Sequence, residues 1–313
     1  MKTQHFICRL FILIGIITLS PLQAQDASAL LGKWDLEVEK EGKIYPSWLE
    51  VKLSGVKTLV GHFVSISGSA RPISEVFFHE GVVDFSIPPQ WDGSNYMHFS
   101  GQLADEKLSG TILNSEGEAL AFKGVRAPKL IRNAPVNWSK PRSLFDGKTL
   151  KFWKPFHNKR ANQWEVKEGE LVSPKTGVNL ITEEEFTDFK LHIEANYPKG
   201  SNSGIYLRGR YEVQVEDSYG KDPSSILFGG VYGFLTPNEM VAKPADSWQE
   251  FEITLIGRRV TIKANGKTVI HDQIIPGITG GAIDSKEGMP GPILLQGDHG
   301  PVKFRNIRIQ TPQ

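Results

Sequence analysis

Apolar and polar residues alternate along most of the chain, in short runs that turn residues separate. The stretch NSGIYLRGRYEVQVEDS, residues 202–218, shows the pattern, since Val213 and Val215 flank the polar Gln214. A period of two is typical of a strand that turns one face toward the core. Helical spacing is scarce, because only the turn after Thr182 carries a capping signal. The pattern therefore predicts an all-β protein.

The first third of the chain predicts a small β-domain over residues 25–127. Strands this short, separated by Gly, Asn and Asp, indicate an antiparallel barrel or sandwich. The triplet Gly32-Lys33-Trp34 opens the first run and resembles the G-x-W start of lipocalin-like barrels. The alternating runs are WDLEVEKEGKIYPSWLEVKL, TLVGHFVSI, VVDFSI, NYMHFSGQL, KLSGTIL and ALAFKGVRA.

A second domain is predicted over residues 142–313. Residues 128–141, PKLIRNAPVNWSKP, carry three prolines and little periodicity, which is typical of a linker. Strand patterns then return, and Asn265-Gly266 predicts a tight hairpin turn. A region of this length, made of strands and long loops, fits a two-sheet jelly roll. A chain of 313 residues is long enough for two such cores.

Composition and the N-terminus narrow the possible partners and compartment. The 36 Lys and Arg nearly balance 35 Asp and Glu, which disfavours the basic field that nucleic-acid binding uses. Lys2 and Arg9 flank a short apolar run that ends near Ala24, so we expect a cleaved signal peptide and a secreted or periplasmic protein. The apolar run is too short to span a bilayer. Cleavage would also remove Cys8, the only cysteine.

Three neighbouring strand patterns carry large polar side chains at their outward positions. A solvated, ion-paired sheet face and a ligand groove both explain such a set. The residue types suit a sugar, because Arg and Gln pair with hydroxyls, aromatic rings stack on pyranose faces and carboxylates transfer protons. If the strands are neighbours, the patch contains His192, Glu194, Tyr206, Arg208, Glu212 and Gln214.

Five separated segments between Arg142 and Gln310 resemble the 3-keto-disaccharide hydrolase family, whose fold is a concanavalin-A-like jelly-roll sandwich. The resemblance implies an enzyme that cleaves 3-keto-glycosides made by a sugar-oxidising dehydrogenase. A ketone at C3 acidifies the C2 proton, so a base can expel the C1 substituent by elimination, and direct hydrolysis is the competing route. The segments are LFDGKTLKFW (144–153), WEVKEGELVS (164–173), the stretch 202–218, DSWQEFEITLIGRRVTIKANGKTVI (246–270) and GPILLQGDHGPVKFRNIRIQ (291–310).

The matching motifs suggest site residues. We expect Glu194 or Glu212 to act as the base and His299 to donate a proton or to bind a metal. The sequence establishes no cofactor. A divalent metal, Ca, Mn or Zn, would use Glu194, Glu212, Asp217 and His299, although no typical ligand spacing is present. The substrate-binding candidates are His192, Asn202, Tyr206, Arg208, Gln214, Gln296 and Arg305.

Each assignment has a structural alternative. Arg208 and Glu212 could form a cross-strand ion pair of little energetic weight. His299 lies in the turn-like run Gly297–Gly300, where an imidazole often only satisfies a backbone carbonyl. At the level of the whole protein, the competing functions are a non-catalytic carbohydrate-binding protein and a structural module of the cell envelope.

Overall fold

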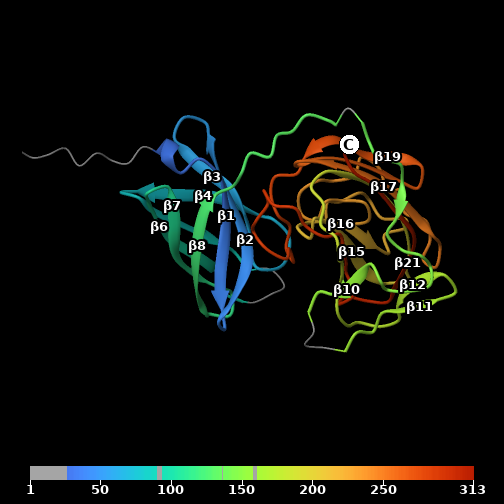
Figure 1. Cartoon of the computed structure of the whole chain (residues 1–313). Coiled ribbons are helices and arrows are strands. Elements are labelled where there is room, and N and C mark those ends of the chain that lie inside the picture. The colour runs from blue at the N-terminus through green and yellow to red at the C-terminus, as the bar shows by residue number, and fades with distance from the viewer. Residues whose placement is uncertain (1–26, 90–93, 136, 158–160) are drawn as a thin grey trace, which may run out of the picture.

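The computed structural model describes residues 27–89, 94–135, 137–157 and 161–313 and consists almost entirely of β-strands (Figure 1). Eight strands close a barrel, and two further sheets form a sandwich. Among the described residues the only helical element is the 3-10 turn η1 (Ala27–Ala29). The predicted all-β fold class, with a barrel followed by a jelly-roll sandwich, is confirmed. The predicted signal peptide lies outside the described residues.

The barrel is an antiparallel meander in which each strand pairs with the next and β1 closes onto β8. Its interior is a packed apolar core, in which Phe99 stacks on Phe85 and meets the tilted ring of Phe122, at centroid distances of 4.5 and 4.4 Å. The strands are β1 (Gly32–Lys40), β2 (Lys43–Ser54), β3 (Thr58–Val64), β4 (Arg71–His79), β5 (Val82–Ile87), β6 (Met97–Ala104), β7 (Lys107–Leu113) and β8 (Ala119–Arg126).

One sheet of the sandwich has five strands in the order β10-β13-β20-β15-β16. The other has the order β11-β12-β21-β14-β17-β18-β19, with β9 paired to β21. The strands are β9 (Arg142–Ser143), β10 (Trp153–Pro155), β11 (Glu165–Lys167), β12 (Glu170–Ser173), β13 (Leu180–Thr182), β14 (Phe189–Asn196), β15 (Asn202–Leu207), β16 (Tyr211–Glu216), β17 (Gln249–Ile256), β18 (Arg259–Ala264), β19 (Lys267–Ile274), β20 (Leu294–Leu295) and β21 (Val302–Gln310).

The apolar positions of the alternating strands meet between the two sheets. Ile193 of β14 and Val213 of β16 both belong to this core. The predicted hairpin joins β18 to β19, and Asn265 and Gly266 have φ angles of 48° and 83°, as a tight two-residue turn requires. The apolar positions of the alternating pattern thus face the core that the two sheets share, and the polar positions face outward on each sheet.

The outer face of the five-stranded sheet is covered by long loops, so its polar positions are buried. Every residue from Ser203 to Val215 is buried, which does not fit the alternative of a solvated sheet face. Part of the cover is the β16–β17 connection. It lies along β16, where the Gln214 N–H donates to Gly230 O at 2.9 Å and the Tyr232 N–H donates to Glu212 O at 3.0 Å.

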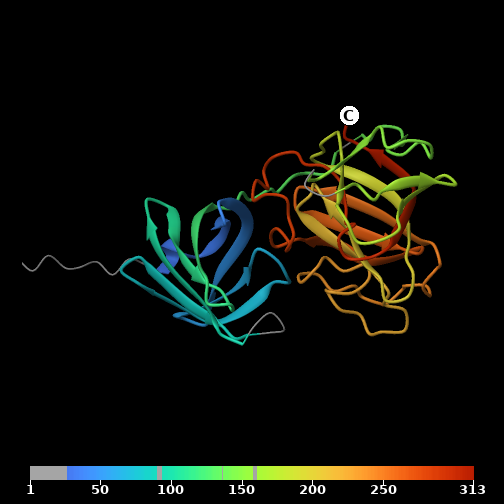
Figure 2. The ribbon, with the colours of Figure 1, turned by 90° about the horizontal axis from the view of Figure 1, so that it is seen from below.

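Barrel and sandwich lie side by side, and residues 127–135 lead from the barrel toward the sandwich (Figures 1 and 2). Side chains also join them directly. Trp48 of β2 belongs to the apolar core of the sandwich and meets Phe234 edge-on at 5.4 Å. Lys33 Nζ donates to Pro276 O at 2.7 Å.

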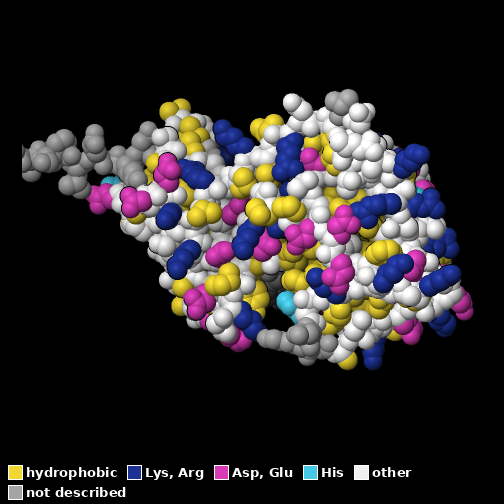
Figure 3. All heavy atoms as spheres, in the orientation of Figure 1, with side chains coloured by type: hydrophobic (Ala, Val, Ile, Leu, Met, Phe, Trp, Pro, Cys, Tyr) yellow, Lys and Arg dark blue, Asp and Glu magenta, His cyan; other side chains and the backbone are white. Residues whose placement is uncertain are grey.

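On the face that Figure 3 shows, positive and negative side chains intermix over both parts, and a narrow hollow opens between barrel and sandwich. No broad patch of one charge gathers on that face, in keeping with the formal net charge of +1. Within the described part of the chain, no helix is long and apolar enough to cross a membrane.

Candidate functional site

Polar side chains gather beneath the loops on the outer face of the five-stranded sheet. The antiparallel register of β15 and β16 pairs Tyr206 with Glu212 and Gly204 with Gln214. Because side chains on one face of a strand recur every second residue, Tyr206, Glu212 and Gln214 point the same way. Gln296 follows β20 and joins the group, since its N–H donates to Gly204 O at 3.0 Å. The sheet therefore brings four of the predicted residues together.

Glu212 is the central acid of this site. Its residue exposure is 4%, and burial raises the pKa of its carboxyl to about 8, while the Tyr206 hydroxyl and His299 act in the opposite direction. Gly204 makes room for it, because a Cβ at that position would lie 2.5 Å from Glu212 Oε1. At neutral pH the carboxyl is therefore mainly protonated and can donate a proton.

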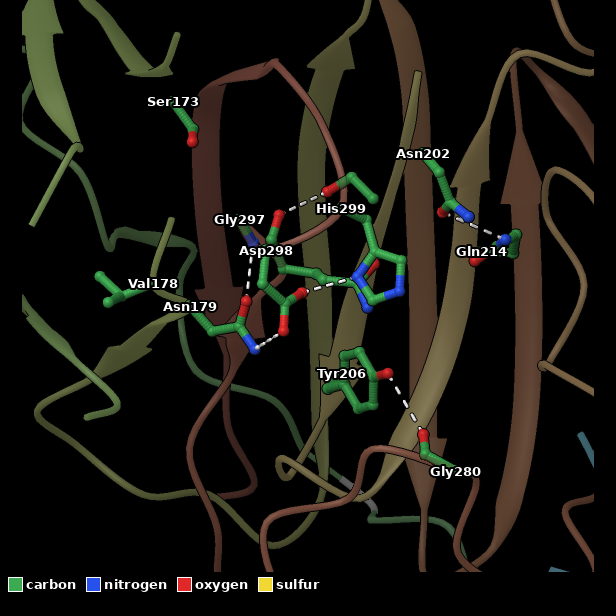
Figure 4. A network of polar contacts seen from close by, with 12 residues as sticks. Ser173, Val178, Asn179, Asn202, Tyr206, Gln214, Gly280, Gly297, Asp298 and His299 are labelled. Carbon is green, nitrogen blue, oxygen red and sulfur yellow. Dashed lines mark hydrogen bonds and ion pairs between the residues drawn. The ribbon is translucent and has the colours of Figure 1, made fainter. Parts of the chain in front are cut away.

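Tyr206 supplies a hydroxyl beside the acid. This hydroxyl donates to Gly280 O at 3.2 Å (Figure 4). Burial and the nearby Glu212 raise the pKa of Tyr206 well above its ordinary value, so the phenol stays neutral. A neutral phenol beside a sugar can donate a hydrogen bond to an oxygen that gains negative charge.

An imidazole held by a carboxylate faces the same region. His299 Nδ1 lies 2.7 Å from Asp298 Oδ1, and Asn179 Nδ2 donates to Asp298 Oδ2 at 3.4 Å (Figure 4). The hydrogen bond that the His299 ring donates to Asp298 raises the pKa of His299 against the opposing effect of burial, and Glu212 adds to the shift whenever its carboxyl is ionised. Burial opposes ionisation of Asp298, but the bonds from His299 and Asn179 still lower its pKa.

This arrangement is suited to proton transfer. The His299 side chain remains 53% exposed, so the ring can reach a ligand while Asp298 fixes its orientation. Glu212 and His299 each influence the pKa of the other, which places the acid and the imidazole in one electrostatic unit.

Amides line one side of the site. Gln214 Nε2 donates to Asn202 Oδ1 and to Glu216 Oε2, both at 3.3 Å. With the Gln214 amide turned over, its nitrogen would instead donate to Glu212 Oε1 at 3.2 Å. Gln296 Oε1 is buried and finds no donor among the described residues. Such a buried acceptor can take a hydrogen bond from a ligand hydroxyl.

Glu194, His192 and Arg305 do not join this site, which corrects the predicted patch. Strand β14 belongs to the other sheet, because residues 197–201 cross from one sheet to the other before β15 begins. On that outer face, Arg305 Nε and Asn306 Nδ2 donate to the Glu194 carboxylate at 2.7 and 2.6 Å. The three predicted residues thus lie on the opposite side of the sandwich from Glu212.

Arg208 is also placed elsewhere than predicted. It lies in the β15–β16 turn with φ 54°, where the alternation of the strands no longer applies, and it is fully buried. Its guanidinium donates to Tyr211 Oη at 2.8 Å and to the carbonyl oxygens of Glu287 and Gly257, each at 3.0 Å. Arg208 therefore braces one end of the sandwich and forms no ion pair with Glu212.

The four residues named as metal ligands do not form one group. Glu194 lies on the opposite sheet, and Asp217 Oδ2 accepts the Gly200 N–H at 2.9 Å. Among the described residues, no cluster of three or more His, Cys, Asp or Glu side chains could hold a metal ion.

Sequence reasoning missed Asp298, Asn179 and Gly204. The signal for Asp298 was its place directly before His299, and a glycine inside a strand, such as Gly204, often marks a close approach. Asn179 gave no signal, because it meets Asp298 across 119 positions of sequence.

Comparison with known proteins agrees with the resemblance of the five segments. The model of the 3-keto-alpha-glucoside-1,2-lyase-like domain matches residues 140–310. A 3-keto-disaccharide hydrolase from Bacteroides thetaiotaomicron is 26% identical over 133 residues, which cover 39% of this chain. The match spans only 44% of that relative's length.

Solved structures also resemble the chain. A candidate glycosyl hydrolase from Parabacteroides distasonis shares 29% identity, with a TM-score of 0.48, over 56% of this chain and 84% of that one. A second candidate glycosyl hydrolase from the same organism shares 23% identity, with a TM-score of 0.44, over 55% of this chain and 100% of that one.

Proposed function

The chain belongs to the 3-keto-alpha-glucoside-1,2-lyase-like domain family, and from this membership we propose that it cleaves the glycosidic bond of 3-keto-glycosides at the Glu212–His299 site. The observation that carries the proposal is a buried carboxyl with a pKa of about 8 that is coupled electrostatically to the His299 imidazole. A protonated carboxyl beside an imidazole suits a reaction that delivers one proton and removes another.

The first chemical step is elimination. Neutral His299 removes the acidic C2 proton, and Asp298 stabilises the imidazolium that forms, as the 2.7 Å contact between the two side chains allows. Electrons flow into the C3 ketone as an enolate, then return to form the C1–C2 double bond while the C1–O bond breaks. Protonated Glu212 gives its proton to the departing oxygen.

Hydration completes the reaction with the roles reversed. Ionised Glu212 takes a proton from water as the oxygen adds to C1, and the His299 imidazolium returns a proton to C2. The donor for the C3 oxygen is the Tyr206 hydroxyl, which can turn from Gly280 O toward the substrate. Gln296 Oε1, which has no donor among the described residues, accepts a sugar hydroxyl.

The assignment of Glu212 as the proton donor reverses the role that the sequence suggested for it. Its raised pKa supports the donor, and the Asp298 contact supports His299 as the base. Direct hydrolysis uses the same acid without loss of the C2 proton. A purely carbohydrate-binding role would leave the protonated acid without a task. Export after cleavage near Ala24, and supply of the ketone by a sugar-oxidising dehydrogenase, belong to the same proposal.

The test uses purified protein and two chromogenic substrates, 4-nitrophenyl 3-keto-glucoside and 4-nitrophenyl glucoside. We expect release of nitrophenol from the keto substrate only. Deuterium at C2 should slow the reaction if elimination limits it and leave direct hydrolysis unchanged. Binding of the keto sugar without release of nitrophenol would favour the carbohydrate-binding alternative.

A further inference from the structure

A loop of the barrel lies directly against the sandwich loops that border the Glu212–His299 site. This rim loop, residues 65–70 between β3 and β4, approaches so closely that only glycines fit opposite it. A Cβ on Gly280 would lie 2.1 Å from Gly68 O, and a Cβ on Gly233 would lie 2.6 Å from Ala70 N. The barrel backbone and the site loops are therefore in contact.

The sandwich residues on this contact are those that hold the site. Gly280 O accepts the Tyr206 hydroxyl at 3.2 Å. Tyr232, next to Gly233, donates its N–H to Glu212 O at 3.0 Å. Gly280 thus contacts both the rim loop and the Tyr206 hydroxyl. Gly233 contacts the rim loop too, and its neighbour Tyr232 holds the backbone of Glu212.

The position of the rim loop is fixed by the packing around it. Trp48 of β2 and Val64, the last residue of β3, both belong to the apolar core of the sandwich. Ser285 Oγ donates to Leu36 O at 2.6 Å on the same side of the barrel. Because barrel and sandwich share this packing, the rim loop keeps one position relative to the Glu212–His299 site.

The rim loop also lines a small polar hollow on the barrel. The hollow has a volume of about 60 Å³, room for a hydroxyl or hydroxymethyl group rather than a whole sugar. Among the described residues that line it, none is acidic and the one cation, Arg71, donates to Pro88 O at 2.7 Å. The remaining hydroxyl and amide groups suit a ligand rich in hydroxyl groups. Its polar lining residues are Ser65, Ser67, Ser69, Arg71, Asn95, Asn114 and Ser115.

We propose that the barrel rim is a second sugar subsite, which binds the sugar attached through C1 of the keto sugar in the Glu212–His299 site. This inference rests on the proposed function. Elimination expels the C1 substituent, so the remainder of a disaccharide must extend from C1 out of the site. Gly68 both lines the hollow and contacts Gly280, which joins the two sites through a single backbone contact. The barrel then selects disaccharides over simple glycosides.

The test compares two keto substrates, methyl 3-keto-glucoside and a 3-keto glucosyl-glucose disaccharide. Ser67 is exposed, so Ser67→Trp should fill the hollow without disturbing the core. We expect kcat/KM for the disaccharide to fall on the order of tenfold, as for a few lost hydrogen bonds, with the methyl glycoside unchanged. The double variant Ser67→Ala, Ser69→Ala should lower the disaccharide preference in the same direction.

The matched control is Ser54→Trp, at an exposed serine of β2 outside the hollow, which should leave both substrates unaffected. An unchanged ratio of the two kcat/KM values in both rim variants would overturn the subsite. Equal loss with both substrates would do so too, because the loop would then act only through the fold. If the unaltered protein cleaves neither substrate, the proposed function fails. Calorimetric titration of the disaccharide into Glu212→Gln, with and without Ser67→Trp, then decides the subsite alone.

Discussion

The two outer faces of the sandwich come from the same alternating pattern, yet they differ in everything that matters for chemistry. Glu212 lies on the five-stranded sheet beneath loops, and burial raises its pKa to about 8. Glu194 lies on the opposite sheet, where burial is outweighed by hydrogen bonds from Asn306 and Arg305, so its pKa is lowered. The comparison shows that the loops covering a strand, and not the residue types of the strand, decide whether a glutamate can donate a proton or only forms an ion pair.

Exchanging each glutamate for glutamine tests this contrast most strongly. Glu212→Gln should lower kcat on the keto substrate by about 10³- to 10⁴-fold, because the proton donor is lost. Glu194→Gln makes the same change on the other face and should leave kcat within about twofold, since the ion pair of Glu194 with Arg305 lies on the opposite side of the sandwich from the site. Steady-state kinetics of the two variants measure the difference. Comparable losses in both would mean that the site is wrongly placed.

The imidazole pair should show the next largest effect. His299→Ala removes the proposed base and should lower kcat by about 10²- to 10³-fold. Asp298→Asn keeps the ring but loses the charge that orients it, so a loss of about 10- to 100-fold is expected. In Asp298→Asn the kinetic pKa of His299 should also move down, because Asp298 is what raises it. A pH profile of kcat/KM that stays fixed would contradict this role.

Room for Glu212 depends on the glycine opposite it. Gly204→Ala would place a Cβ 2.5 Å from Glu212 Oε1, so the carboxyl must shift or the strands must part. We expect a loss of about 1–3 kcal/mol in the free energy of unfolding together with lowered activity. Gly288→Ala is the control, because the nearest atom there, Pro128 Cγ, is 3.8 Å away. Denaturant unfolding of both variants measures the loss of stability. Equal losses in the two variants would rule out crowding at position 204.

The smallest effect is a pH dependence of stability. Because the folded protein binds the Glu212 proton more tightly than the unfolded chain, stability falls as the pH rises from the ordinary value of 4.5 through about 8. The glutamine of the Glu212→Gln variant is neutral at every pH. The Tm of the variant minus that of the unaltered protein should therefore increase by a few degrees between about pH 5 and pH 8. Thermal unfolding at both pH values gives the answer, and a constant Tm difference would mean that the carboxyl is not buried.

Alternation was enough to predict the fold class, the hairpin at Asn265-Gly266 and the shared face of Tyr206, Glu212 and Gln214. It could not predict that β14 and β15 belong to different sheets, because a period of two assigns faces and not neighbours. The error for Arg208 has a local cause, since a residue at φ 54° in a turn follows no strand alternation.

The pairing of Asp298 with Asn179 was beyond prediction for a different reason. It depends on two loops that meet only in the folded sandwich, so no local pattern encodes it. The burial of Glu212 could not be predicted either, because the loop that covers β16 carries no periodic pattern in the sequence.

Trp48 has a consequence for how the protein is made. The barrel leaves the ribosome before the sandwich, yet this indole belongs to the sandwich core, where Phe234 and Gly277 lie against it. The burial of Trp48 seen in the complete fold therefore waits for residues that are synthesised nearly 200 positions later.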